Sequence, residues 1–276
     1  MLFNGDINYN NTMKLGLALG GGGAKGFAHL GILEVFTEAG IEFDVVAGTS
    51  IGAFIGAVYI SDNLSDLKQY AVGIGIADLP FLLGPTWPKG GLFSGKFLEK
   101  LIDKFIQVEN IEDLKKPFAA VCVDLNKGET ITFTSGNIKR AIRASTSIPG
   151  LFKPIMFEDK LLVDGGVLES VPDKAVRDIG ADFVLAIDLL SDLSGNDSFK
   201  NTKPPSIVDV VQRSSILAQR IITEYKFKEH PPDLVISPPL SHIKVMDFHN
   251  GKSIVEIGRE AAKKVLPELL DKINKN

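Results

Sequence analysis

Ser50 is the residue best suited to chemistry, because Gly48 and Gly52 complete a Gly-x-Ser-x-Gly pattern around it. An extended apolar run, 41–47, precedes the pattern, and a helical run of small residues, 51–60, overlaps its end. This strand–turn–helix context is typical of a nucleophile elbow, in which a sharp turn strains the serine and exposes its hydroxyl. The two glycines leave room for the strand and helix to pass closely, and the helix directs its positive N-terminal end at the site. The pattern predicts a nucleophilic serine; a chance match in a glycine-rich chain is the alternative.

A glycine-rich loop at residues 20–26 is the second candidate. It joins a short apolar run, 15–19, to a helical run, 27–39. Glycines in such a loop let several backbone N–H groups approach one anion, because no Cβ atom blocks them. An oxyanion hole, a dinucleotide site, a P-loop and a tight turn without a ligand are the competing interpretations.

The residues around this loop favour the oxyanion hole. A dinucleotide site needs an acidic residue at the end of the second strand, whereas Asp44 lies within that predicted strand. A P-loop needs Ser or Thr after its lysine, whereas Gly26 follows Lys25. Only an oxyanion hole uses the serine elbow that comes next in the chain. The residues assigned to this loop are Gly21, Gly22, Gly23, Ala24, Lys25 and Gly26.

Asp164 is the third candidate, and Gly165 and Gly166 follow it directly. It ends a short extended run, 160–163, so its carboxylate would be exposed and conformationally free. Asp-Gly is also a common turn dipeptide. Taken alone, this motif indicates an ordinary turn.

Together the three motifs resemble those of the patatin-like phospholipases, in particular the short bacterial single-domain members. The family pattern is G-G-G-x-[KR]-G, then G-x-S-x-G, then D-G-[AG], and the chain matches it in this order. Residues 145–152 are also similar to the family's segment before the aspartate. The resemblance covers about residues 14–188 and extends more loosely to the C-terminus. It implies a Ser–Asp dyad, with Ser50 as nucleophile and Asp164 as general base, acting on a lipid or another acyl ester without a cofactor.

The four histidines independently favour a dyad over a Ser-His-Asp triad. His29 follows the glycine loop in a helical run, where packing or capping is expected. The other three, His230, His242 and His249, lie in loop-like or polar surroundings of the C-terminal quarter. A triad would need one of them beside Ser50. A standard α/β-hydrolase also has several strands before its elbow, whereas about two fit here.

The expected chemistry is acyl transfer through an acyl-enzyme. Asp164 would accept the Ser50 proton, and backbone N–H groups of residues 21–23 would hold the oxyanion. A free aspartate, with a pKa of about 3.9, is a weak base at neutral pH, and desolvation would strengthen it. Lys25 would either place positive charge near the oxyanion or a substrate phosphate, or be a solvated lysine at a helix start.

Length and composition agree with one α/β domain. The 276 residues suffice for a sizeable core, and the 45% hydrophobic and 23% charged fractions are ordinary for a soluble protein. A net charge of −4 offers no support for binding nucleic acid or an anionic membrane. The single cysteine, Cys122, lies in an apolar run and is predicted to be a buried strand residue. No disulfide framework or Cys/His metal spacing is present, so we expect no metal.

The N-terminus predicts neither a leader nor a membrane span. Residues 1–12 are polar and Asn-rich, without a basic start and apolar run, so we expect a flexible extension before a single catalytic domain at 13–276. The uncharged run 45–60 is shorter than the ~20 residues that a span needs. We expect a cytoplasmic protein that contacts membrane surfaces transiently. A lipid-binding regulatory protein with weak or no turnover, or a Rossmann-type nucleotide-binding protein, are the alternative functions.

Strand-like and helix-like runs alternate along the chain, which predicts an α/β fold with three α/β/α layers around a mostly parallel sheet. After the serine elbow, strands are expected at 118–124, 129–134, 160–163, 183–188 and 233–236. Helices are expected at 65–72, 94–105 (with Ser94 as N-cap), 137–145, 171–179, 207–227 and 251–273, and a loop at 190–205.

Residues 73–91 form the longest stretch that is both irregular and apolar, and it contains three prolines. Prolines prevent a regular helix from hiding the apolar side chains on one face, and long loops of this kind are often lids. We expect this segment to border the substrate entrance, with Trp87 as its fluorescent reporter. Insertion of these side chains into the core is the alternative.

Overall fold

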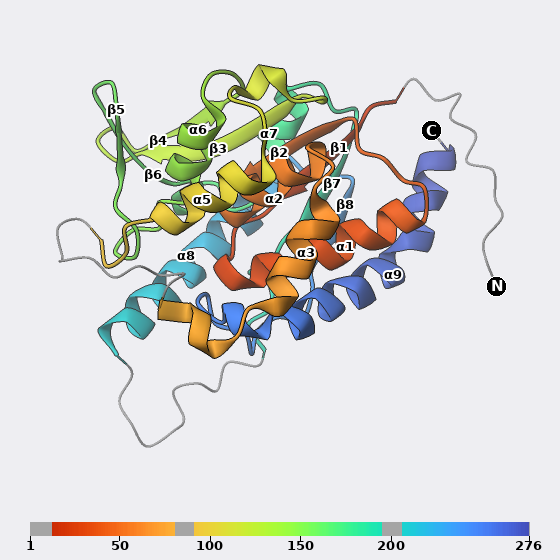
Figure 1. Ribbon diagram of the computed structural model, residues 1–276. Helices are drawn as coiled ribbons and strands as arrows, with labels where there is room; N and C mark the ends of the chain where they lie inside the picture. Colours follow the sequence, from red (N-terminus) through yellow and green to blue (C-terminus); the bar gives the residue numbers. More distant parts are fainter. Residues whose placement is uncertain (1–12, 81–90, 195–205, 276) are drawn as a thin grey trace.

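The computed structural model describes residues 13–80, 91–194 and 206–275 (Figure 1). The expected extension at 1–12, Trp87 and most of the expected loop at 190–205 lie outside these residues.

A mixed sheet of eight strands forms the centre of the described structure, in the order β5-β6-β3-β2-β1-β7-β8, with β4 paired to β3 (Figure 1). The central strands β3, β2, β1, β7 and β8 run parallel, whereas β4, β6 and β5 join by antiparallel pairing. The predicted mostly parallel sheet is confirmed. The strands are β1 (Leu15–Leu19), β2 (Val45–Thr49), β3 (Phe118–Asp124), β4 (Glu129–Phe133), β5 (Ile155–Phe157), β6 (Lys160–Asp164), β7 (Phe183–Ile187) and β8 (Leu234–Ile236).

Helices cover both faces of the sheet, which confirms the three-layer architecture. The thicker layer contains α1 (Phe27–Glu38), α2 (Ile51–Ile60), α3 (Leu64–Gly73), α5 (Lys96–Phe105), α6 (Ile138–Ser145) and α9 (Gly251–Lys275). The thinner layer contains α7 (Asp173–Asp178) and α8 (Ile207–Glu229).

The strand alternation explains the difference between the two layers. In β1, Leu15, Leu17 and Leu19 point into the larger core beneath α1 and α9, whereas Ala18 points toward α7. The α7 side is lined mainly by alanine and valine, so a short helix packs closely there. Phe227 is the residue through which α8 joins this second core. The sheet is therefore well covered on one face and thinly covered on the other.

Several predicted boundaries differ from the structure, among them those of β2 and α5. Strand β2 begins at Val45 rather than at 41, and Asp44 lies directly before it, where its carboxylate accepts a hydrogen bond from the Leu15 N–H (2.7 Å). Helix α5 begins after Gly95, whose φ of 73° is left-handed. The predicted N-cap role of Ser94 is therefore wrong, because that residue lies one position too early.

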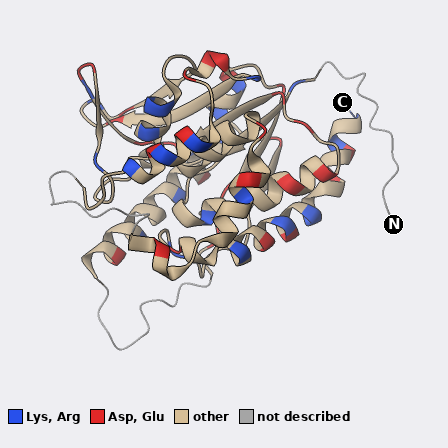
Figure 2. Cartoon of the chain, in the orientation of Figure 1, with Lys and Arg blue, Asp and Glu red and all other residues tan. Residues whose placement is uncertain are grey.

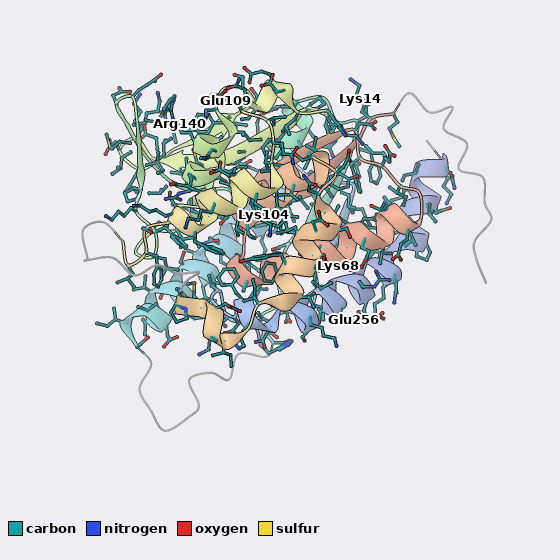
Figure 3. All side chains as sticks on the ribbon, viewed as in Figure 1. Lys14, Lys68, Lys104, Glu109, Arg140 and Glu256 are labelled. Carbon is teal, nitrogen blue, oxygen red and sulfur yellow. The ribbon has the colours of Figure 1, made fainter. Side chains whose placement is uncertain are left out.

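Charged side chains lie mainly on the outside of the helices. Lys68, Lys104 and Glu256 are at the outer surface of the thick layer (Figure 3), and both charge signs alternate along α9 (Figure 2). Within the described ranges, none of the helices has the length and apolar character required to cross a bilayer.

Candidate active site

Ser50 lies in the turn between β2 and α2, at the carboxyl end of the central strands. Its backbone has φ 58° and ψ −127°, a strained conformation for a residue with a side chain. Gly52 permits this turn, because a Cβ atom there would lie 2.1 Å from the Leu19 carbonyl oxygen. The structure thus contains the sharp strand-to-helix turn expected from the sequence.

Asp164 reaches Ser50 from the end of β6. Strand β3 pairs with β2 through Val121 and Thr49. The next residue, Cys122, pairs with Asp164 of β6, which brings the end of β6 beside Ser50. The Ser50 hydroxyl donates a 2.5 Å hydrogen bond to Asp164 Oδ2, and the Gly166 N–H donates to Oδ1 at 2.8 Å. Only 4% of Ser50 and 5% of Asp164 is exposed. The carboxylate is therefore a buried hydrogen-bonding partner of the serine rather than part of an exposed turn.

Burial sets the protonation behaviour of Asp164. Removal from water raises the pKa of this carboxyl to about 7. The hydrogen bonds from Ser50 and Gly166 lower the pKa, but their effect is smaller than that of burial. A carboxylate with a pKa near neutrality is a much better proton acceptor than a free aspartate. The same burial raises the pKa of the neighbouring Cys122 thiol to about 12, and the charge of Asp164 adds to this rise.

A buried serine at the end of α6 supports the strained turn. Ser145 Oγ accepts a hydrogen bond from the Ser50 N–H (2.8 Å) and donates to the Val121 carbonyl oxygen (2.6 Å). Two residues later, the Ser147 carbonyl oxygen accepts from the Asp164 N–H (3.0 Å). In the sequence, residues 145–152 stand out only through their similarity to a family segment, and no local pattern predicts this positioning role of Ser145.

The glycine loop lies beside Ser50, and its N–H groups are not equivalent. The Gly21 N–H donates to the Ser170 carbonyl oxygen (2.9 Å), and the Ala24 N–H donates to the Val245 carbonyl oxygen (2.8 Å). Across the residues that the structure describes, the N–H groups of Gly22 and Gly23 have no protein acceptor. Gly23 has φ 59°, and a Cβ atom there would lie 2.4 Å from the Val245 oxygen. The expected donation by Gly21 to an oxyanion is therefore not available in this arrangement, which leaves Gly22 and Gly23.

The histidines lie away from the hydroxyl of Ser50. His29 is fully buried behind the loop, where its ring Nε2 donates to the Gly20 carbonyl oxygen (2.8 Å). Burial lowers the pKa of His29 to about 4, so the ring is neutral. Among the described residues, no histidine lines either of the cavities that contain Ser50.

Lys25 is buried rather than solvated, which overturns the alternative of an exposed lysine at a helix start. Only 2% of the residue is exposed, and burial lowers the pKa of its ammonium group to about 8. The carboxylates of Asp192 and Asp188 oppose that effect, whereas the Arg213 charge adds to it. Lys25 does not line the Ser50 cavities.

Two cavities meet at Ser50 and differ in chemistry. The first, about 100 Å³, has mostly apolar walls, which include Phe27, Phe54, Leu67, Ile74, Leu98, Leu101 and Phe152. The second, about 110 Å³, also contains Asp164 and is bordered by α8, which contributes polar side chains: Gln212, Ser215 and Gln219. Ile74 is the one part of the expected entrance segment seen at these walls, and residues 81–90 of that segment lie outside the described residues.

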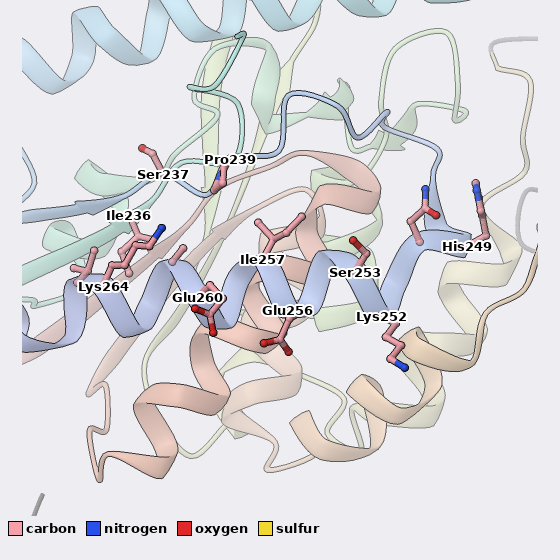
Figure 4. A pocket seen from close by; sticks show the side chains of 13 residues that line it. Ile236, Ser237, Pro239, His249, Lys252, Ser253, Glu256, Ile257, Glu260 and Lys264 are labelled. Atoms are coloured by element: carbon pink, nitrogen blue, oxygen red, sulfur yellow. The ribbon is translucent and has the colours of Figure 1, made fainter. Parts of the chain in front are cut away.

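A larger hollow of about 760 Å³ runs along α9 beside residues 236–239 (Figure 4). His249, Glu256 and Glu260 are among its lining residues. It shares no residue with the two Ser50 cavities. The buried serine–carboxylate pair therefore belongs to the two smaller cavities.

Comparison with known proteins agrees with this site. The profile of the patatin-like phospholipase family matches residues 17–176. "Lysophospholipase nte1" of Emericella nidulans is 31% identical over 92% of this chain, but the chain spans only 18% of that protein. Human "patatin-like phospholipase domain-containing protein 6" is 29% identical over 91% of the chain, which spans 20% of that protein. In fold, the crystal structure of VipD from Legionella pneumophila is similar, with a TM-score of 0.51, 15% identity and coverage of 93% of this chain and 67% of VipD.

Proposed function

Because this chain belongs to the patatin-like phospholipase family, we propose that it hydrolyses a carboxylic ester of a lipid through a Ser50–Asp164 dyad. The observation that carries the proposal is the 2.5 Å hydrogen bond from the Ser50 hydroxyl to a buried carboxylate. The strained turn at Ser50 and the pKa of about 7 for Asp164 support the same assignment.

In the proposed reaction, Asp164 accepts the Ser50 proton as Oγ attacks the ester carbonyl carbon. The carbonyl oxygen becomes negative and receives hydrogen bonds from the N–H groups of Gly22 and Gly23. Removing one such donor typically costs about 3 kcal/mol of transition-state stabilisation. Asp164 then returns the proton to the leaving alcohol, and a water molecule hydrolyses the acyl-enzyme in a second cycle of the same proton transfers.

The two cavities suggest how a substrate is oriented. The acyl chain occupies the apolar cavity beneath α5, because burying hydrocarbon there is favourable. The leaving alcohol occupies the cavity beside Gln212, Ser215 and Gln219, whose side chains can bond to hydroxyl groups. The second cavity is similar in volume to the first but has more polar side chains in its walls, so it suits the leaving alcohol better than a second long acyl chain. A single-chain lipid, as the names of the relatives suggest for those proteins, is therefore the proposed substrate, held by residues 13–276 acting as one catalytic domain.

Covalent labelling of Ser50 tests the proposal. A fluorophosphonate probe is expected to label the wild type and not Ser50→Ala. Ser61→Ala is the matched control, because Ser61 lies at the other end of α2 with its hydroxyl bonded to the Ala57 carbonyl oxygen. Equal labelling of the wild type and Ser50→Ala would remove the nucleophile assignment. Labelling without turnover of any ester in a panel of lysophospholipids and soluble esters would favour a lipid-binding regulatory protein instead.

Single replacements of the C-terminal histidines test the dyad. Replacing His230, His242 or His249 is expected to leave ester hydrolysis within a few-fold of wild type. A histidine variant as inactive as Ser50→Ala would replace the dyad with a triad.

A further inference from the structure

Helix α8 carries an apolar stripe that faces solvent along its whole length. At about 100° per residue, the members fall within about 120° of the helix circumference, which places them on one face of the helix. Between 43% and 84% of each is exposed: Ile207, Val210, Val211, Leu217, Ile221 and Tyr225. These six residues are called the α8 stripe below.

The neighbouring face of α8 borders the candidate active site. Gln212, Ser215 and Gln219 line the cavity that contains Ser50. Val211 belongs to both surfaces, because it lines this cavity and is 56% exposed. The α8 stripe is therefore continuous with the rim of the cavity through which a substrate would approach Ser50.

Packing within the protein does not account for the apolar character of this helix. Thr223 is the single buried residue among the 23 of α8. An ion pair between Lys226 and Glu169 (2.9 Å) connects the helix to the segment that follows β6. Monomeric proteins rarely leave contiguous apolar patches of this kind exposed unless they bind something. In Figure 2 the N-terminal half of α8 is mostly tan, in contrast to α9.

We infer that the α8 stripe docks the protein on the surface of a zwitterionic lipid aggregate, an inference that rests on the proposed function. A lipid hydrolase must take its substrate from such an aggregate, and the stripe borders the cavity where the ester would react. Helices with one apolar face lie in the plane of a lipid surface with that face buried by about 5–10 Å. In this orientation Val211 would contact the lipid surface and also line the Ser50 cavity, so the cavity would open next to the lipid.

The charges on α8 predict how this contact depends on salt and lipid. The helix contains four basic residues, Arg213, Arg220, Lys226 and Lys228, and three acidic ones, Asp209, Glu224 and Glu229. The whole chain has a net charge of −4. Attraction to anionic lipid is therefore weak, and apolar insertion is the main contribution. Binding should be nearly independent of ionic strength, unlike contacts made by basic clusters.

Vesicle flotation of the full chain tests the inference, with Ser50→Ala as the background so that the lipid stays intact. Phosphatidylcholine vesicles containing lysophosphatidylcholine are the probe. Ile221→Glu should weaken binding by about ten-fold or more, because a charge replaces an inserted apolar side chain. Ile221→Leu is the matched control and should bind like the parent. Thr37→Glu, at an exposed position of α1, controls for an added carboxylate elsewhere.

The outcomes separate docking from catalysis. In the Ser50-containing protein, Ile221→Glu should hydrolyse a short, fully soluble ester at the wild-type rate and vesicle-borne substrate at least about ten-fold more slowly. Absence of binding by the parent, equal binding by Ile221→Glu, or binding that salt abolishes would overturn the inference. A dimer that Ile221→Glu dissociates, seen by analytical ultracentrifugation without vesicle binding, would assign the stripe to a second copy of the chain. Failure of fluorophosphonate to label Ser50 would refute the proposed function and leave the flotation result unaffected.

Discussion

Replacing Asp164 with asparagine should abolish most turnover and also make the folded protein more stable above neutral pH. Only 5% of this residue is exposed, and burial raises the pKa of its carboxyl to about 7. Asparagine has nearly the same shape and can still accept the hydrogen bond from the Gly166 N–H. It cannot accept the Ser50 proton, however, and it carries no charge to desolvate. The buried charge of the carboxylate that serves as the base therefore lowers the stability of the folded protein.

The sign and size of the stability effect follow from the pKa. The unfolded chain releases the Asp164 proton at about pH 4, whereas the folded protein releases it at about pH 7. Between these values the folded state binds more protons, so the free energy of unfolding falls as pH rises. The contribution of this proton to the free energy of unfolding is complete at pH values below the pKa of the unfolded chain. It is lost at pH values above the pKa of the folded protein. A rise in pKa from 3.8 to about 7 corresponds to about 4 kcal/mol, at about 1.4 kcal/mol per pKa unit.

Urea unfolding of wild type and Asp164→Asn at about pH 5 and about pH 8 measures this effect. The stability of the variant relative to wild type should increase by about 3 kcal/mol on going to the higher pH, because part of the total of about 4 kcal/mol is already lost at about pH 5. Asp178→Asn, at an exposed end of α7, controls for the loss of one negative charge. In the same series, wild-type kcat/KM for a soluble ester should rise to a plateau above about pH 7, and Asp164→Asn should lose at least about a hundred-fold. A stability difference that does not change with pH would refute the desolvated carboxylate, and near-normal turnover by the variant would refute its role as base.

Three further substitutions test the surroundings of the site. Ser145→Ala should lower the free energy of unfolding by about 2 kcal/mol, because two buried backbone groups lose their partner; an unchanged urea midpoint would contradict this. Gly52→Ala should abolish fluorophosphonate labelling, since its Cβ atom would lie 2.1 Å from the Leu19 oxygen, and wild-type labelling would show that the turn can relax. Leu101→Trp should fill the apolar cavity of about 100 Å³ and shift preference toward shorter acyl chains in a p-nitrophenyl ester series, whereas an unchanged preference would place the acyl chain elsewhere.

Much of the fold could be predicted because its signals are local. The run Phe118–Asp124 was expected as a strand and is β3, fully buried as its apolar sequence indicates. Ile51–Ile60 was expected as a helix and is α2, with the same bounds. Cys122 is buried in β3, as predicted. The short strand β5 (Ile155–Phe157) was not predicted, because three residues are too few to show an alternating pattern.

Properties of the site that depend on packing could not be read from the sequence. An Asp-Gly dipeptide indicates a turn, and only the pairing of β6 with β3 shows that the Asp164 carboxylate is withdrawn from water. The availability of each loop N–H likewise depends on distant carbonyl groups, such as that of Ser170. The sequence leaves open whether Lys25 is solvated or near the site, because its local sequence gives no sign of the chain segments that bury it.

The placement of the dyad across β2, β3 and β6 has a consequence for the order of folding. Ser50 and Asp164 are 114 positions apart in the chain, and contacts of such long range must wait for a large loop to close. The serine turn belongs to the β1–β2 unit near the N-terminus and can form early, whereas its base arrives only when β6 pairs antiparallel with β3. A partly folded chain would then carry an unactivated serine. Hydrolytic activity would then appear only when the central sheet is complete. The rate at which probe labelling recovers during refolding would therefore report the pairing of β6 with β3, not the initial collapse of the chain.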